Sequence, residues 1–97
     1  MRAAALELAP EVTVNAVQPG AVNTPMLRSG LGRSESASVK EEMGLLAGRT
    51  PLGALGSPQQ VAELVSLLVS RGAARFMTGS VVRIDGGALL RLATESP

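Results

Sequence analysis

Apolar residues crowd positions 12–17 and occupy both alternating faces of an extended chain. β-Branched residues such as Val17 favour a strand here, and a strand that is apolar on both faces is typical of a parallel sheet covered by helices on both sides. The strand is predicted to end at Pro19 and Gly20, because Pro19 has no N–H for a sheet and Gly20 lets a ligand approach the backbone closely. The loop after such a strand is where open α/β sheets bind ligands.

The clearest helical pattern begins at Ser57. Ser57 and Gln60 have the spacing of a capping box, and Pro58 suits the first position of a helix. An apolar stripe with the spacing i, i+3, i+4, i+7 follows, made by Val61, Leu64, Val65 and Leu68. Gly72 is predicted to end this helix, and the stripe is predicted to be buried.

Weaker patterns predict the remaining elements. Residues 2–9 are rich in strong helix formers and stop at Pro10, which indicates the end of a helix. Residues 36–47 carry apolar positions at helical spacing, residues 80–85 predict a second strand, and residues 88–97 show no clear period. Because a helix connects the two predicted strands, we expect them to be parallel. Two strands leave an edge and part of a face uncovered, so the chain is predicted to be part of a larger sheet.

Composition narrows the classes of function. The 97 residues suit a single domain, and 45% of them are hydrophobic, which is enough for a core. A net charge of +1 and a single aromatic residue, Phe76, argue against binding of nucleic acid. Because the sequence contains no Cys and no His, disulfides, Cys/His zinc sites and His-based triads are excluded for these residues, and no metal site is predicted. No apolar run approaches the roughly 20 residues of a membrane span and no secretory signal is recognisable, so we expect no membrane association and a cytoplasmic location.

Three runs of sequence are distinctive together: LELAPEVTVNAVQPGAVNTPM, PLGALGSPQQVAELVSLLVS and FMTGSVVRIDGG. They resemble the C-terminal part of a short-chain dehydrogenase/reductase, and their order and spacing fit that family from residue 2 to residue 87. The resemblance implies an α/β protein, specifically the C-terminal fragment of a doubly wound Rossmann fold that contains a helix end, a strand, lid helices, a helix and a parallel strand. It also implies that residues 1–97 are part of one NAD(P)-binding domain with a substrate-side lid at 25–50. The implied reaction is the NAD- or NADP-dependent interconversion of an alcohol and a carbonyl group in a small molecule.

The resemblance implies roles for individual residues at the end of the first strand. Pro19 and Gly20 would pack against the nicotinamide end of the cofactor. The backbone of Val22, with the hydroxyl and N–H of Thr24, would hydrogen-bond the carboxamide, which needs a donor and an acceptor at fixed positions. The apolar lining of the substrate lid would come from Met26, Leu27 and Leu31.

Several parts of the family pattern are absent from the sequence. It contains no tyrosine and therefore no Tyr-x-x-x-Lys pair, which the family uses as its general acid/base, and no glycine-rich phosphate-binding turn. No catalytic residue is therefore assigned, and the chain alone is predicted to be inactive. One interpretation is the C-terminal half of an active oxidoreductase. The other is an inactive, truncated product that acts as a structural module through 57–70 and 80–85, which commonly build homo-oligomers in the family. A third interpretation is an unrelated small α/β domain.

Some of these residues also have a purely structural interpretation. Pro19-Gly20 could be an ordinary turn, Thr24 a simple helix cap, and Asp85 a structural acid at the end of the second strand. The arginines are expected to form a solvated face, with recognition of a substrate charge as the alternative. They are Arg28, Arg33 and Arg49.

Overall fold

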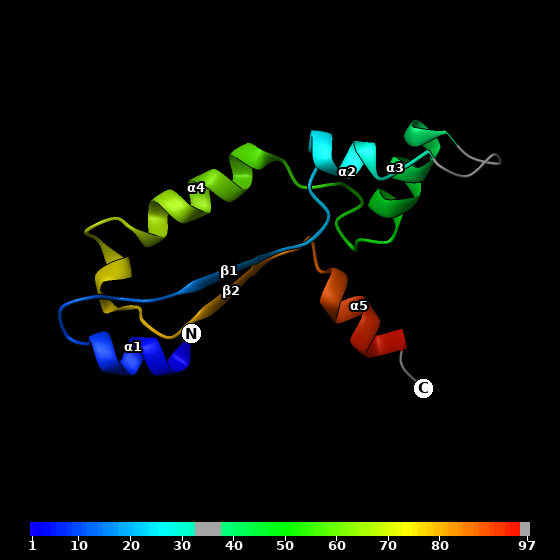
Figure 1. Cartoon of the computed structure of the whole chain (residues 1–97). Helices are drawn as coiled ribbons and strands as arrows, with labels where there is room; N and C mark the ends of the chain where they lie inside the picture. The colour runs from blue at the N-terminus through cyan, green and yellow to red at the C-terminus, as the bar shows by residue number, and fades with distance from the viewer. Residues whose placement is uncertain (33–37, 96–97) are drawn as a thin grey trace.

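The computed structural model describes residues 1–32 and 38–95, with side chains up to residue 91. Along the chain the elements are α1 (Arg2–Leu8), β1 (Ala16–Pro19), α2 (Pro25–Ser29), α3 (Val39–Gly48), α4 (Pro58–Leu68), the 3₁₀ helix η1 (Ala73–Phe76), β2 (Val81–Ile84) and α5 (Ala88–Glu95) (Figure 1). They form an elongated body of 53 × 34 × 21 Å. Across the described ranges, no helix is both long enough and apolar enough to cross a bilayer.

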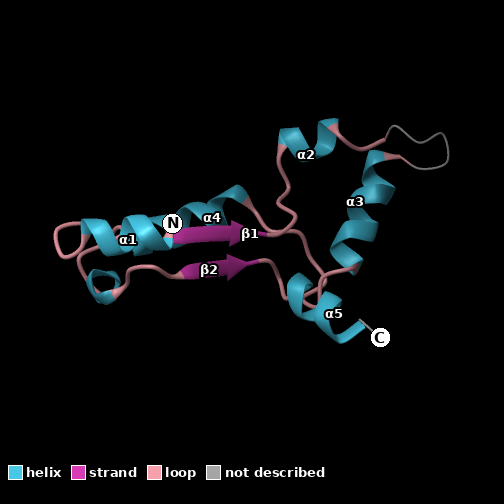
Figure 2. Ribbon diagram, turned by 60° about the horizontal axis from the view of Figure 1, so that its bottom comes forward, coloured by secondary structure: helices cyan, strands magenta, loops and turns pink. Residues whose placement is uncertain are grey.

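The two strands lie side by side and run parallel. Ala16 is opposite Val81, and Pro19 is opposite Ile84. Figure 2 shows this small sheet, and Figure 1 shows α1 and α4 on opposite sides of it. The parallel pair confirms the prediction from the strand–helix–strand order.

The first strand begins later than the apolar pattern predicts, because side chains replace part of the ladder. Before β1, the N–H of Val14 donates to the hydroxyl of Thr78 at 3.1 Å. The Asn15 side chain donates to the carbonyl of Met77 and accepts from the N–H of Ser80, each at 3.1 Å. Ahead of the regular sheet, the two segments are therefore joined by the Asn15 amide, by the Thr78 hydroxyl and by one backbone bond, from the N–H of Gly79 to the carbonyl of Val14 at 2.7 Å.

The central helix, α4, has the N-terminus that its sequence predicts. The hydroxyl of Ser57 accepts from the N–H of Gln60 at 3.1 Å, and the side chain of Gln60 accepts from the N–H of Ser57 at 2.9 Å. The helix ends before Gly72, however. The hydroxyl of Ser70 donates to the carbonyl of Leu67 at 2.7 Å and so satisfies a carbonyl group at an earlier helix end.

The predicted helix over 36–47 is present as α3. Ser38 is its N-cap, and the hydroxyl of Ser38 accepts from the N–H of Glu41 at 3.2 Å. The first two predicted residues, 36 and 37, lie outside the described residues. A short preceding helix, α2, starts at Pro25, so the described part of residues 25–50 contains two helices.

The last helix, α5, is absent from the sequence prediction. The carboxylate of Asp85 accepts from the N–H of Leu89 at 3.2 Å, and this bond caps the first turn of α5. From the same helix, the guanidinium of Arg91 donates to the carbonyl of Gly48 at 2.9 Å, which ties α5 to the end of α3. These hydrogen bonds hold a helix whose amphipathic pattern the sequence analysis did not detect.

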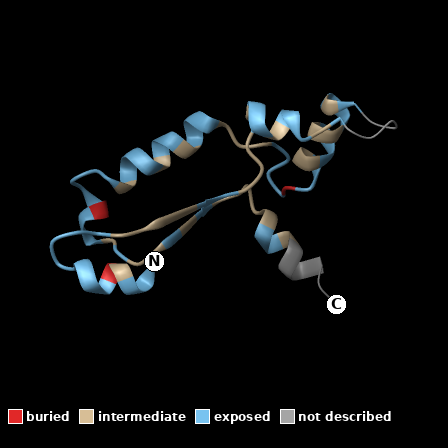
Figure 3. Ribbon diagram, viewed as in Figure 1, coloured by how far each residue is buried: buried red, intermediate tan, exposed pale blue. Residues whose placement is uncertain are grey.

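Few apolar side chains are buried. Among the described side chains, Ala5 and Ala74 form the buried apolar set, whereas Leu6 is 82% exposed and Val69 is 77% exposed. Figure 3 shows that most of the ribbon is exposed or intermediate. This agrees with the expectation that the chain is part of a larger sheet, because its apolar strand and helix faces need cover that these residues do not supply.

Candidate functional site

The ends of the two strands meet at Gly20 and Asp85. The N–H of Gly20 donates to the carbonyl of Ile84 at 3.1 Å, one residue beyond the end of β1. A Cβ atom on Gly20 would lie 2.9 Å from both the Cα and the Cβ of Asp85. Because real Cβ atoms do not come so close to backbone, this approach needs glycine.

Beyond Gly20, the chain makes a single parallel bridge between Val22 and Gly56. The N–H of Asn23 donates to the carbonyl of Gly56 at 2.9 Å, and the N–H of Gly56 donates to the carbonyl of Ala21 at 3.0 Å. The neighbours of Val22 thus make the bridge, and the N–H and C=O of Val22 itself face the other way. No other described residue bonds either group, so a donor and an acceptor stand side by side on this loop.

Thr24 caps α2. Its hydroxyl oxygen accepts from the N–H of Leu27 at 3.1 Å, and its extended backbone leads into Pro25 at the first helical turn. Thr24 is therefore a helix cap, as the simpler interpretation of this residue predicts. It does not use the hydroxyl hydrogen, which stays available to donate, because capping needs only the oxygen as acceptor.

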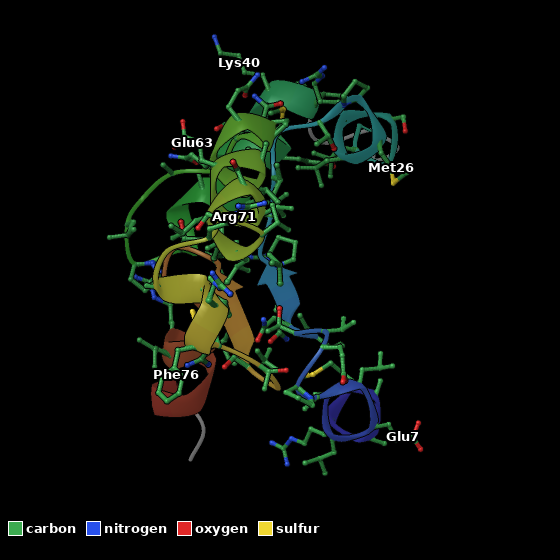
Figure 4. The ribbon with its side chains drawn as sticks, turned by 90° about the vertical axis from the view of Figure 1, so that its left-hand side faces the viewer. Glu7, Met26, Lys40, Glu63, Arg71 and Phe76 are labelled. Atoms are coloured by element: carbon green, nitrogen blue, oxygen red, sulfur yellow. The ribbon has the colours of Figure 1, made fainter. Side chains whose placement is uncertain are left out.

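A hollow of about 500 Å³ lies at this end of β1. It is lined by Pro19, Gly20, Ala21, Val22, Thr24, Met26, Leu27, Gly30 and Leu31. All seven residues that the sequence analysis assigns to the cofactor and the substrate lid are among them. Figure 4 shows Met26 on the outer side of α2, and its side chain is 85% exposed, so this wall of the hollow is open.

Asp85 has a structural role in this arrangement. Its carboxylate accepts from the N–H of Gly87 at 2.9 Å as well as from the N–H of Leu89. The bonds from Gly87 and then Leu89 hold the pKa of Asp85 below its ordinary value, and the charge of Arg83 adds to the effect. Asp85 thus closes the turn after β2 and caps α5.

The arginines do not gather in the described structure. The guanidinium of Arg28 donates to the side-chain oxygen of Asn23 close to its own helix, and both Arg28 and Arg49 are exposed. Arg33 lies outside the described residues. The structure therefore brings no pair of these arginines into the hollow.

The sequence analysis missed Asn15 and Gly56. Asn15 is a polar residue beside a strand that has apolar residues on both faces. A polar side chain in such a place needs hydrogen-bond partners when it is buried, and this requirement could have indicated a structural role for Asn15. Gly56 gave no local signal, because its partner Val22 is distant in the sequence.

Comparison with known proteins places this geometry in a family. The family described as enoyl-(acyl carrier protein) reductase matches residues 1–88. The 1,2-dihydroxy-1,2-dihydronaphthalene dehydrogenase of Pseudomonas putida is 41% identical over 93 residues, which are 93% of this chain and 36% of that protein. A crystal structure of a short chain dehydrogenase family protein from Francisella tularensis superposes with a TM-score of 0.84 and 34% identity over 92% of this chain. The chain belongs to the short-chain dehydrogenase/reductase family.

Membership of this family confirms the predicted α/β Rossmann-like fold and its fragment character. The chain spans 36% of the Pseudomonas putida dehydrogenase and 38% of the Francisella tularensis protein. A solved actinorhodin polyketide ketoreductase variant with NADPH also superposes, with a TM-score of 0.77 and 36% identity over 90% of this chain and 34% of that one. This short-chain dehydrogenase/reductase chain therefore corresponds to roughly the last third of the family fold in length.

Proposed function

We propose that this chain forms the nicotinamide side of the active site of an NAD- or NADP-dependent oxidoreductase, which interconverts an alcohol and a carbonyl group in a small molecule. The observation that carries the proposal is the hollow at the end of β1, whose lining contains all seven assigned residues. Family membership supports the oxidoreductase class. The proposal covers either dinucleotide, NAD or NADP, and the cytoplasmic location stays a prediction.

The residues around the hollow have the chemistry that a nicotinamide group needs. Val22 offers an N–H and a C=O that no other described residue uses, and Thr24 offers a hydroxyl hydrogen. A carboxamide has one donor and one acceptor side, so these groups would hold it in one orientation. Pro19 and Gly20 would pack against the nicotinamide ring, because Gly20 has no side chain to keep the ring away from the backbone. The dinucleotide supplies the hydride chemistry when bound, and these residues bind and orient it.

The lid would act on the substrate side. Residues 25–50 follow the end of the strand, and the hollow is lined by Leu27 from α2 and by Leu31, which comes just after that helix. Such apolar side chains would exclude water from the reacting atoms and contact the substrate. Met26 would join this lining from the open wall of the hollow.

The chain would act as part of a longer assembly, which we call the assembled enzyme: this chain joined to the N-terminal portion of a family member. The sequence has no tyrosine to serve as the family's general acid/base, so that group would come from the other portion. The alternative is an inactive module that docks on a relative through α4 and β2. Exposed apolar residues on both elements, such as Leu67 at 58% and Val81 at 52%, favour this alternative.

A substitution at Thr24 tests the proposal. Thr24→Asp keeps an N-cap acceptor but removes the hydroxyl hydrogen, whereas Thr24→Ser keeps both. In the assembled enzyme, we expect Thr24→Asp to weaken NADH or NADPH binding about three- to tenfold, equal to about 0.5–1.5 kcal/mol for one hydrogen bond. Thr24→Ser should bind like the parent in a fluorescence titration. Unchanged binding by Thr24→Asp, or no saturable binding by the parent, contradicts the proposal.

A further inference from the structure

Another hollow lies where α5 meets the C-terminal end of α3, and Figure 2 shows the two helices side by side at this point. It has a volume of about 510 Å³. Among the described residues that line it, two are arginines and none is acidic. The lining residues are Ala21, Leu46, Gly48, Arg49, Thr50, Ala88 and Arg91. We call this space the basic hollow.

The guanidinium of Arg91 is anchored at the basic hollow. It donates to the carbonyl of Gly48 at 2.9 Å, and Gly48 directly precedes Arg49 in the chain. The bond also sets a positive charge against the last carbonyls of α3, whose partial negative charge would otherwise repel an anion. The charge of Arg91 therefore lies within one residue of the backbone of Arg49.

The side chain of Arg49 has no structural partner in the described part of the chain. Its backbone N–H donates to the carbonyls of Leu45 and Leu46, which fixes where the side chain begins. The side chain itself is exposed, and no described residue forms a hydrogen bond or an ion pair with its guanidinium. A guanidinium presents its N–H donors in a planar fork that matches a carboxylate or a phosphate group. Two guanidiniums around one hollow create a positive potential that attracts such anions.

Shared residues connect the basic hollow with the hollow at the end of β1. Ala21 lines both of them, and its side chain is a single methyl group. A smaller hollow of about 190 Å³ adjoins both, because Leu31 also lines the hollow at the end of β1 and Arg49 also lines the basic hollow. A small molecule whose reacting carbon lies beside Gly20 can therefore extend toward Arg49.

One acidic residue, Glu42, lines the smaller hollow. Its carboxylate accepts a hydrogen bond from the N–H of Gly32 at 2.8 Å, so it is engaged by the loop after α2. It is not part of the lining of the basic hollow. The positive charges of the basic hollow are therefore not neutralised by an acid of its described lining.

We propose that the basic hollow binds an oxyanion at the far end of the substrate, a carboxylate or a phosphate group, through Arg49 and Arg91. This proposal rests on the proposed function, because it names the class of small molecule that reacts there: an alcohol or a ketone that carries an anionic group. Arg49 supplies the fork from which the anion accepts hydrogen bonds, and Arg91 adds charge and holds the end of α3. In the simpler alternative, both arginines only complement the end of α3.

The test uses the assembled enzyme and three pairs of ketones, matched except for the anionic group. The anionic members are 4-oxocyclohexanecarboxylate, 4-oxopentanoate and dihydroxyacetone phosphate, and the neutral members are the two methyl esters and dihydroxyacetone. Isothermal titration calorimetry measures each dissociation constant with the oxidised dinucleotide present, so that no ketone is reduced. We expect at least one anionic member to bind at least about tenfold more tightly than its neutral partner.

Variants of Arg49 assign that preference to the basic hollow. Arg49→Gln removes the charge and the fork, and it should raise the dissociation constant of the anionic ketone about tenfold while changing that of the neutral one less than about twofold. Arg49→Lys keeps the charge without the fork and should lose an intermediate amount. Arg71→Gln is the matched control, because it removes the same charge from an exposed position that lines neither hollow. Far-UV circular dichroism should be the same for all variants.

Each remaining outcome overturns one of the two proposals. Equal effects of Arg49→Gln and Arg71→Gln, or no saturable binding and no preference for the anionic member in any pair, leave the arginines as partners of the helix end and overturn the anion site. Binding of inorganic phosphate that depends on Arg49, without a preference among the ketones, makes the hollow a site for a free anion and also overturns the proposal. Arg49-dependent binding of an anionic ketone without binding of NADH or NADPH leaves the anion site intact and overturns the proposed function. Cofactor binding that depends on Thr24, without any effect of Arg49, does the reverse.

Discussion

The side-chain oxygen of Asn15 accepts a hydrogen bond from the backbone N–H of Ser80 at 3.1 Å, across 65 positions of sequence. The nitrogen of the same amide donates to the carbonyl of Met77. One side chain therefore provides both the donor and the acceptor of a missing rung of the sheet, at the point where β2 approaches β1. No other common side chain of this length offers both groups in fixed positions.

Replacing Asn15 with Asp should destabilise the fold. The carboxylate keeps the acceptor for Ser80 but faces the carbonyl of Met77 without a hydrogen to donate, which leaves that bond unmade at a cost of about 1–3 kcal/mol. Urea denaturation of the assembled enzyme measures the loss. Gln18→Glu is the matched control, because it makes the same chemical change at an exposed position of β1 and should cost less than about 0.5 kcal/mol. Similar losses for both would contradict the role of Asn15.

Gly20→Ala should also destabilise the fold. The new Cβ would lie 2.9 Å from the backbone of Asp85, so the strand ends must move apart, with an expected cost of about 1–3 kcal/mol. Gly44→Ala is the matched control, since nothing lies within 4 Å of its Cβ position in α3. That change should stabilise the helix by roughly 0.5–1 kcal/mol. Thermal unfolding of both variants checks the predicted opposite signs.

Asp85 should make stability depend on pH in the acid range. Its pKa is lowered from an ordinary 3.8, chiefly by the N–H groups of Gly87 and Leu89, so the folded state favours the charged carboxylate. The stability that Asp85 adds is fully present when the pH is above the ordinary pKa of the carboxyl group. It is lost as the pH falls through the lowered pKa of the folded state. Unfolding free energies measured from pH 2 to 7 should show Asp85→Asn less stable than the parent at neutral pH and equal to it in acid. A constant difference across that range would sink the prediction.

Removing the cap of α4 should weaken it. Ser57→Ala deletes the acceptor for the N–H of Gln60 and should cost about 0.5–2 kcal/mol. Ser66→Ala in the middle of the same helix is the control, because Ala has the higher helix propensity and Ser66 is exposed. Denaturation midpoints of the two variants should move in opposite directions.

The isolated chain should be marginally stable and should not bind the cofactor. With Ala5 and Ala74 as its buried apolar set among the described side chains, it has little core to oppose the loss of chain entropy. We expect no cooperative transition of the dilute chain above about 60 °C, the upper part of the mesophile range. Fluorescence titration with NADH or NADPH should show no saturation in the micromolar range. A sharp transition at higher temperature, or saturable binding, would prove these expectations wrong.

Local chemistry in the sequence predicted the strand end, the capped helix and the parallel strand order. Pro19, Ser57 and Gln60 each act through groups within a few residues, so their spacing is enough to interpret them. The residues that line the hollow were named through the resemblance to the family, and they are nearly contiguous in one loop. These predictions needed no knowledge of distant partners.

Some parts that the sequence did not predict depend on contacts between distant segments, and others on short-range bonds of side chains. α5 begins where Asp85 caps it and is tied through Arg91 to Gly48, and neither contact is visible in its own period. The pairing by Asn15 and the bridge from Gly56 to Val22 join segments that are far apart in the chain. The bond from the hydroxyl of Ser70 to the carbonyl of Leu67 is local and lies where α4 ends.

Pro19 has a consequence for how far any sheet built on this chain can extend. Pro19 is the last residue of β1 and has no N–H. The edge of β1 that faces away from β2 therefore lacks a backbone donor just before the hollow begins. An added strand can pair with Val17 but has nothing to pair with at the next donor position. The imino ring thus limits strand growth at the edge of the hollow that Pro19 and Val22 line.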